Sequence, residues 1–190
     1  MNTQIQITKC VIDCETTGLD AKTNDIIQLA LLPVNDQFVP IKAPLNIRIK
    51  ALTPETACTT ALAINKLNPR EGMDITESRD AFYSWRTLNC IDMIAPLAHN
   101  YQFDKLFIEK WLIACGLLYQ DYFHYIVRDS MILATAANDA RKLKGYKPLS
   151  RSVSLGTLCS AFAIDSSGTH DALTDCHLTL EVYKKLLVIS

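Results

Sequence analysis

The sequence lacks any apolar run that approaches the roughly 18 residues of a membrane span. Its first residues, MNTQIQITKC, contain no apolar stretch typical of a secretory signal. We therefore expect a cytoplasmic protein that has no membrane partner. Repeats, low-complexity tracts and linkers are absent as well. A chain of 190 residues with this composition is expected to form a single α/β domain, residues 1–190.

Paired cysteines are also missing. The sequence has seven cysteines, but none of them forms a Cys-x-x-Cys pair. An odd number of scattered cysteines without a secretory signal indicates reduced thiols in a cytoplasm. Cys10 and Cys14 have the spacing of residues on one face of a strand, and we expect both to fill the core.

An excess of positive charge is missing too, because the formal net charge is −1. No general basic field can hold nucleic acid, so an acidic partner would have to be bound locally, by a metal or a small basic patch. The stretch RKLKGYKPLSR at 141–151 has five cations around Tyr146. It is predicted either to follow a phosphate backbone, with Tyr146 stacked on a base, or to be a solvated loop.

The hydrophobic patterns place strands before helices. The run VIDCETTGLD at 11–20 begins as a strand, and the β-rich runs at 25–34 and 38–50 continue it as an antiparallel meander. Short strands are expected within 93–100 and 123–130. Helical patterns lie at 101–115, 129–142, 152–163 and 171–188, with an irregular helical region at 55–90. This order predicts an α/β sheet protein with an antiparallel portion.

Two carboxylates interrupt the end of the first apolar run. Asp13 and Glu15 point to the same face of a strand and lie about 6–7 Å apart along it. Like charges at this spacing repel each other, and each raises the pKa of the other. A cation between them would remove the repulsion, whereas the plain alternative is a solvated strand end.

Two further acids head apolar faces of predicted helices. Asp104 and Asp175 align at helical spacing with apolar residues: Phe107, Ile108, Trp111 and Cys115 for the first, and Leu178, Val182 and Leu186 for the second. Asp104 would also suit a helix dipole. A buried, unpaired carboxylate is costly, so we expect these acids to converge with Asp13 and Glu15 on divalent metal ions. Ligands that are all oxygen favour Mg²⁺ or Mn²⁺ over Zn²⁺.

A histidine precedes the last of these acids. His170 follows a Ser-Ser-Gly segment, so we expect it on a loop that enters the last helix. From a loop it can reach the acids, and histidine suits a general base for water near neutral pH. The alternative is an ordinary surface histidine, and we interpret His124 and His177 as structural.

Together these residues resemble the DnaQ-like, DEDDh family of 3′–5′ exonucleases. VIDCETTGLD matches the family's Asp-x-Glu-Thr-Thr-Gly, HNYQFDKLFI matches His-Asn-x-x-Phe-Asp, and THDALTDCHLTLEVYKKL matches His-x-Ala-x-x-Asp with its trailing helix. The three motifs come in the family's order, and the resemblance covers most of the chain. It implies a ribonuclease-H-like fold, in which a mixed five-stranded sheet is flanked by helices.

The resemblance also implies roles for the polar residues. Asp13, Glu15, Asp104 and Asp175 would hold two divalent ions, Mg²⁺ or Mn²⁺, with His170 as the general base. Two ions roughly 3.5–4 Å apart stabilise the attacking and leaving oxygens of an in-line displacement. The implied reaction hydrolyses the terminal phosphodiester bond at a 3′ end and releases a 5′-nucleotide.

Contacts to the 3′-terminal nucleotide are implied for a second group of residues: Thr16, Thr17, Gly18, Leu19, Asn65, His99 and Asn100. The first three would offer backbone groups to the sugar, and Leu19 an apolar contact to the base. Asn65 stands where histidine is frequent in the family. Asn100 also has the position of a helix N-cap, and Phe103 is interpreted as packing.

The substrate remains a choice between two polymers. Single-stranded DNA is favoured because the motifs are closest to those of proofreading exonucleases. An exoribonuclease is the alternative, since the choice depends on room for a 2′-hydroxyl. A module that only binds nucleic acid would lack one of the five catalytic residues, and all are present. Few residues follow Asp175, so no tail that tethers a polymerase is expected, although a polymerase or a second copy could dock elsewhere.

Overall fold

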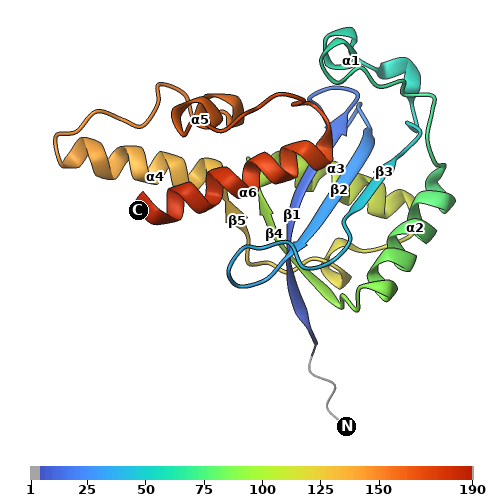
Figure 1. The fold of residues 1–190 in the computed structure, drawn as a ribbon. Coiled ribbons are helices and arrows are strands. Elements are labelled where there is room, and N and C mark those ends of the chain that lie inside the picture. Colours follow the sequence, from blue (N-terminus) through green and yellow to red (C-terminus); the bar gives the residue numbers. More distant parts are fainter. Residues whose placement is uncertain (1–4, 190) are drawn as a thin grey trace.

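A five-stranded mixed sheet forms the centre of the computed structural model, which describes residues 5–189 (Figure 1). Residues 1–4 and 190 of the predicted domain lie outside the described residues. The strand order is β3-β2-β1-β4-β5, made of β1 (Ile7–Thr16), β2 (Ile26–Val34), β3 (Leu45–Arg48), β4 (Met93–Ala98) and β5 (Arg128–Asp129). The β1–β2 and β2–β3 pairs are antiparallel, whereas β1–β4 and β4–β5 are parallel. The predicted mixed five-stranded sheet is therefore confirmed.

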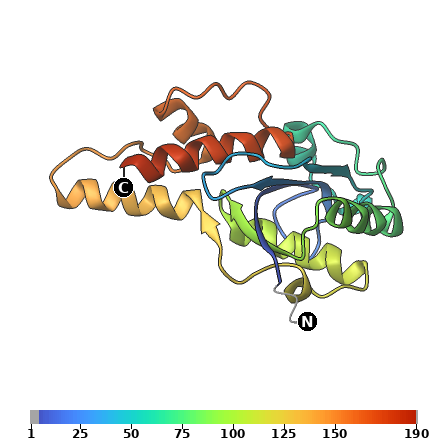
Figure 2. The same cartoon turned by 60° about the horizontal axis from the view of Figure 1, so that its bottom comes forward.

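Helices cover both faces of this sheet (Figure 2). They are α1 (Thr59–Asn65), α2 (Ile75–Leu88), α3 (Tyr101–Ala114), α4 (Ser130–Leu143), α5 (Leu155–Ala161) and α6 (Ala172–Ile189), with 3-10 turns η1 (Pro54–Thr56) and η2 (Tyr119–Asp121). Phe82 of α2 and Trp111 of α3 pack on one face, and Cys176 and Leu180 of α6 pack on the other. α4 and α5 lie against the outer side of α6. No helix of the described part is long and apolar enough to cross a membrane.

The central strand β1 contributes to both cores. Cys10, Ile12 and Cys14 belong to the cluster under α2 and α3, whereas Val11 belongs to the cluster under α6. This alternation is the ordinary period of a strand. It places Asp13 and Glu15, like Val11, on the α6 side of the sheet. The polar residues at the end of β1 thus face the start of α6.

One predicted strand is much shorter than expected. The run 38–50 forms a strand only at Leu45–Arg48, and before it only an isolated bridge joins Pro40 to Val34. Proline has no backbone N–H to donate, so Pro40 and Pro44 keep the segment from joining the ladder. The helix predicted at 152–163 is also shorter, because Ser154 is still extended and α5 begins at Leu155.

Candidate active site

Three elements bring the predicted acids to one end of the sheet. Asp13 and Glu15 lie near the end of β1, on the α6 side. Asp175 lies in the first turn of α6, and Asp104 in the first turn of α3. Asp104 and Asp175 are 3% and 8% exposed. Carboxylates from three distant parts of the chain are therefore withdrawn from water in the same region.

The acids affect one another's ionisation. Burial raises the pKa of Asp13 well above its ordinary value, and the charges of Asp104, Asp175 and Glu15 raise it further. Burial and the charge of Asp175 raise the pKa of Glu15 to about 7. Because the ionised forms of these acids are disfavoured, a bound cation would stabilise the cluster.

Asp104 is held in place from β1. Its Oδ1 accepts hydrogen bonds from the backbone N–H of Cys14 at 3.1 Å and from the Cys14 thiol at 3.2 Å. Burial raises the pKa of Asp104 to about 7, although the bonds from Cys14 oppose this rise. Cys14, which stands between Asp13 and Glu15 in the sequence, was predicted as core filler. It is buried, as expected, and it also positions Asp104.

Three side chains have the spacing of a metal site. Ligand atoms of Glu15, His170 and Asp175 all lie within 4.8 Å of one another. Oδ1 of Asp175 is buried and has no hydrogen-bond partner among the described residues. An unpartnered buried carboxylate oxygen beside a second carboxylate fits a hard divalent cation. Asp13 and Asp104 adjoin this group but are not part of the set within 4.8 Å.

His170 reaches the site from the segment before α6, as expected. The residue is exposed, and its backbone has φ 71°, in the left-handed region. This conformation points its N–H at Oδ2 of Asp175, at 3.1 Å. The backbone of His170 therefore fixes one oxygen of the acid, while its imidazole lies close to Glu15 and Asp175.

A fifth acid, Asp171, belongs to the cluster and was not predicted from the sequence. Its charge raises the pKa of Asp13, Glu15 and Asp175. Nε2 of Gln28, on β2, donates to Oδ2 of Asp171 at 2.9 Å, and the N–H of Thr174 donates to Oδ1 at 3.1 Å. An Asp three residues before a helical N–H is a common N-cap pattern, so the cap was visible in the sequence. The partner Gln28, 143 residues away, was not.

A pocket of about 250 Å³ opens beside Glu15. Thr16, Gly18, Leu19 and Asn65 line it, together with Phe103 of α3. Leu19 is 85% exposed, so an apolar side chain stands free at the pocket mouth. Phe103, predicted as packing only, also forms part of this wall. The pocket has the mixed apolar and polar lining that a nucleotide requires.

Three predicted contact residues do not line this pocket. The N–H of Thr17 donates to the carbonyl of Asp25 at 2.8 Å, and its C=O accepts from the N–H of Cys58 at 2.7 Å. Both backbone groups therefore hold the turn and are not free to bind a ligand. Nδ1 of His99 lies 2.8 Å from Oγ of Ser130. Asn100 occupies the N-cap position of α3 without a side-chain cap. These three residues therefore support the segments around the site and do not form the pocket lining.

Asp129 performs the capping that was considered for Asn100. Its carboxylate accepts hydrogen bonds from the N–H groups of Asn100 and Tyr101 at the start of α3, at 3.2 and 2.8 Å. It also accepts from Met131 and Ile132 at the start of α4, at 2.8 and 3.2 Å. One carboxylate therefore satisfies the free N–H groups of two helices.

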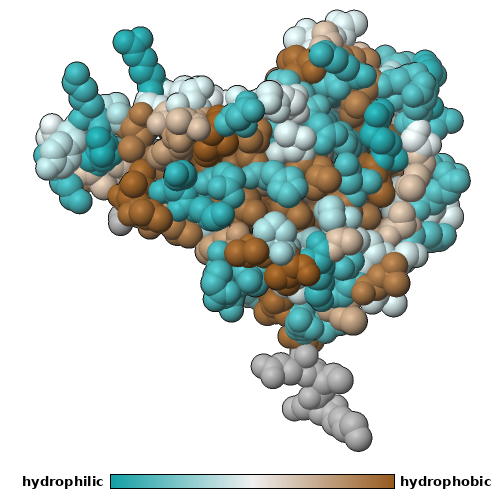
Figure 3. Space-filling model, in the orientation of Figure 1, coloured by the Kyte–Doolittle hydropathy of each residue, from teal (hydrophilic) through white to brown (hydrophobic). Residues whose placement is uncertain are grey.

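The basic stretch 141–151 forms the end of α4 and the beginning of its connection to α5. Lys142, Lys144 and Lys147 are exposed, as is Tyr146 at 63%. Arg141 donates to the carbonyl of Lys147 at 2.8 Å and lies over the ring of Tyr146. No carboxylate among the described residues forms an ion pair with any of these cations. Hydrophilic side chains project from this end of the molecule, on the left in Figure 3.

Buried acids at the end of a mixed five-stranded sheet, with a histidine and an open pocket beside them, define a nuclease with a ribonuclease-H-like fold. The chain belongs to the DnaQ-like 3′–5′ exonuclease family, since the sequence profile of that family, described as Exonuclease, matches residues 10–183. The protein is accordingly a 3′–5′ exonuclease, a hydrolase of phosphodiester bonds, and the family implies a need for divalent metal.

Relatives and similar structures agree with this assignment. Ribonuclease T of Shewanella oneidensis is 25% identical in an alignment 185 residues long, which covers 91% of this chain and 78% of that protein. Ribonuclease T of Shewanella putrefaciens is 24% identical over the same shares. The structure of E. coli exonuclease I with a dT13 oligonucleotide matches with a TM-score of 0.75 at 19% identity, over 95% of this chain and 41% of that chain. Its zinc-bound complex with single-stranded DNA gives 0.74 at 20% identity, over 94% and 40%. The chain spans about 40% of the length of exonuclease I, and this likeness shows the fold.

Proposed function

We propose that this protein removes nucleotides from the 3′ ends of single-stranded DNA, releases 5′-nucleotides, and uses two ions of Mg²⁺ or Mn²⁺. The observation that carries the proposal is the group of Glu15, His170 and Asp175 at the edge of an open pocket. A terminal nucleotide in that pocket would bring its phosphodiester bond to the acids. Exonuclease I, which has the same fold, was solved with single-stranded DNA, and this supports the substrate class.

The acids are the proposed metal ligands. Asp13, Glu15, Asp104 and Asp175 would hold the ions, which, when bound, supply positive charge that stabilises the attacking and leaving oxygens. Nδ2 of Asn65 donates to the carbonyl of Thr16 at 3.1 Å, and the Asn65 side chain lies close enough to Glu15 to oppose the rise of its pKa. Asn65 would thereby help to orient Glu15, a proposed metal ligand, and to hold the pocket wall.

The remaining residues position the substrate and move a proton. Leu19 and Phe103, on two sides of the pocket, would pack against the terminal base, and Thr16 and Gly18 would face its sugar. His170, exposed beside the acids, would accept the proton of the attacking water. The protonated histidine can then return this proton to solvent, because it lies at the surface.

A degradation assay tests the proposal. A 5′-labelled single-stranded DNA is incubated with the protein in Mg²⁺, in Mn²⁺ and in EDTA. We expect a ladder that shortens from the 3′ end in either metal and full protection in EDTA. Asp175→Asn, prepared in parallel, controls for contaminating nucleases and should leave the DNA intact. An undegraded oligonucleotide in every metal would overturn the proposed function.

RNA is a second candidate substrate, because the sequence relatives that cover most of this chain are named Ribonuclease T. Matched DNA and RNA oligonucleotides of one sequence, compared by kcat/KM in the same metal, separate the two candidates. A higher value for RNA would replace DNA as the substrate and leave the chemistry unchanged. The pocket wall at Thr16 and Asn65 is the place where a 2′-hydroxyl would have to be accommodated.

The cysteines support a reducing compartment, and we propose the cytoplasm. All seven are free thiols, and five of them are buried. Docking to a polymerase or to a second copy would use a surface away from the pocket. Sedimentation of the purified protein, alone and with a polymerase, tests both associations.

A further inference from the structure

A buried ion pair lies behind the pocket, outside the acid cluster. Asp25, at the start of β2, is 3% exposed, and its Oδ1 lies 2.8 Å from Nζ of Lys110 on α3. The side chain of Lys110 is 29% exposed. Asp25 and Lys110 belong to none of the three motifs that carry the catalytic residues. The burial of the Asp25 charge requires a reason, because desolvating a carboxylate is costly even when a cation pairs with it.

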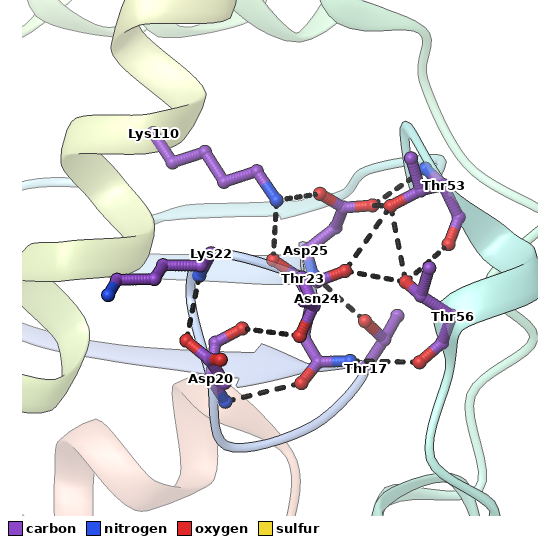
Figure 4. A network of polar contacts seen from close by, with 9 residues as sticks. All are labelled: Thr17, Asp20, Lys22, Thr23, Asn24, Asp25, Thr53, Thr56 and Lys110. Atoms are coloured by element: carbon purple, nitrogen blue, oxygen red, sulfur yellow. Dashed lines mark hydrogen bonds and ion pairs between the residues drawn. The ribbon is translucent and has the colours of Figure 1, made fainter.

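The pair links three segments, α3, the turn after β1 and the segment before α1 (Figure 4). Other residues of α3, of the turn and of α1 form the three walls of the pocket. Oδ2 of Asp25 accepts from the N–H and the hydroxyl of Thr53, both at 2.7 Å, which anchors the segment that leads into α1. Nζ of Lys110 also donates to the carbonyl of Asn24 at 2.8 Å, which anchors the turn after β1. Lys110 itself lies two turns beyond Phe103 on α3. All three segments therefore meet at this ion pair.

The hydrogen bonds continue from the pair to the pocket lining. Nδ2 of Asn24 donates to the carbonyl of Thr56 at 2.9 Å, so the turn and the approach to α1 are linked a second time. A Cβ on Gly18 would lie 2.4 Å from Oδ1 of Asn24. Only glycine fits against Asn24 there, and the position of Asn24 thus fixes the backbone that carries Leu19.

We propose that Asp25 and Lys110 are positioning residues that set the width of the pocket and thereby the affinity for the 3′-terminal nucleotide. The inference rests on the proposed function of the pocket. The pair acts through Asn24 and Thr53, and it touches neither the acids nor the substrate. Its loss lets the Leu19 turn and α1 move away from Phe103, while the acid cluster keeps its own contacts through Cys14 and His170.

The central test compares KM with kcat in two variants. Lys110→Met leaves the charge of Asp25 buried and unpaired, which could itself disturb the fold. The double variant Asp25→Asn/Lys110→Met removes both charges and is therefore included. We expect a KM about tenfold higher or more in both, with kcat within about threefold of the parent. Lys110→Arg, which keeps the charge, should restore most of the affinity. Lys105→Met is the matched control on the same helix, since Lys105 contacts half-exposed Glu109 and the ring of Tyr119 rather than Asp25.

Amide hydrogen exchange provides a readout that does not depend on activity. The N–H groups of Thr53 and Cys58, bonded to Asp25 and Thr17, should exchange faster in the double variant than in Lys105→Met. Unchanged exchange, or a fall in kcat without a rise in KM, would overturn the inference. If the parent protein degrades no oligonucleotide, the proposed function fails, and the exchange data still decide whether the pair holds the walls.

Discussion

At the scale of single residues, His170 combines two tasks in one position. Its backbone N–H fixes Asp175, and its side chain lies beside Glu15 and Asp175. The left-handed backbone makes both possible, and an L-residue other than glycine adopts it at some cost. A substitution can therefore disturb the backbone as well as the base, and the two effects have to be separated.

We predict that His170→Asn lowers the rate by about 10²–10⁴-fold, the usual contribution of a general base. Asparagine tolerates the left-handed region, so this variant keeps the N–H on Asp175 and removes the base. His170→Ala should be at least as slow. The measurement is single-turnover hydrolysis, with metal-induced stabilisation as the check that the acids are intact. Near-normal rates in His170→Asn at neutral pH would show that His170 is not the general base.

At the residue level, spacing along strands and helices is the information that the sequence carries about the position of the acids. The spacing of Asp13, Glu15, Asp104 and Asp175 on strand and helix faces pointed to one site, and the structure gathers them. Asp25 and Lys110 could not be found in this way. An Asp after a turn and a Lys on an amphipathic helix are ordinary in isolation, and only the fold brings them to 2.8 Å.

At the scale of elements, the α4–α5 connection is the part of the chain whose role the fold does not explain. It carries exposed cations that have no carboxylate partner within residues 5–189, next to exposed Tyr146. Arg141 is engaged within the loop, so Lys142, Lys144, Lys147 and Arg151 are the side chains left for a phosphate backbone.

We predict that changing these three lysines to glutamine flattens the salt dependence of oligonucleotide binding. Each phosphate contact to a single strand contributes a slope of about 0.7 in log K against log[salt], so the slope should fall by up to about 2. Lys50 and Arg70, which are exposed and precede α2, serve as the control when both are changed to glutamine. Fluorescence anisotropy in EDTA measures binding without turnover. An unchanged slope would mean that the loop is only solvated.

The boundaries of elements show where sequence patterns fail. Helices with caps and regular apolar spacing, such as α3, were predicted to within a residue. The strand predicted at 38–50 joins the antiparallel meander as expected, but only Leu45–Arg48 pairs, because Pro40 and Pro44 interrupt the ladder before it. Hydrophobic period describes which side chains are buried, and it cannot report which backbone N–H groups are available.

At the scale of the whole molecule, the acid cluster makes folding depend on pH. Glu15 and Asp104 have ordinary pKa values of 4.5 and 3.8 that rise to about 7 in the folded protein. The folded state then binds more protons than the unfolded state between about pH 4 and pH 7. The stabilising effect of these protons is complete below the ordinary pKa values and disappears as the pH rises through about 7.

We predict that the melting temperature of the metal-free protein falls by several degrees from pH 5 to pH 8, since about 1 kcal/mol moves it by roughly 2–4 °C in a chain of this size. Saturating Mn²⁺ should raise the melting temperature at pH 8 again, because it binds the ionised acids. Asp13→Asn removes one buried charge and should abolish turnover while the metal-free melting temperature stays level or rises. A pH-independent melting temperature in EDTA, or a large fall in Asp13→Asn, would contradict this account.

The pocket mouth also offers a route to observing the protein at work. Only Cys58 and Cys90 of the seven thiols are exposed, and Cys58 lines the pocket, while Cys90 lies beyond the end of α2. Hydrogen bonds from Ala61 and Thr60 lower the pKa of Cys58, which favours reaction with a maleimide dye. A fluorophore attached there would sense occupancy directly, with Cys90→Ser leaving a single label, so that each arrival and departure of a strand could be followed in real time.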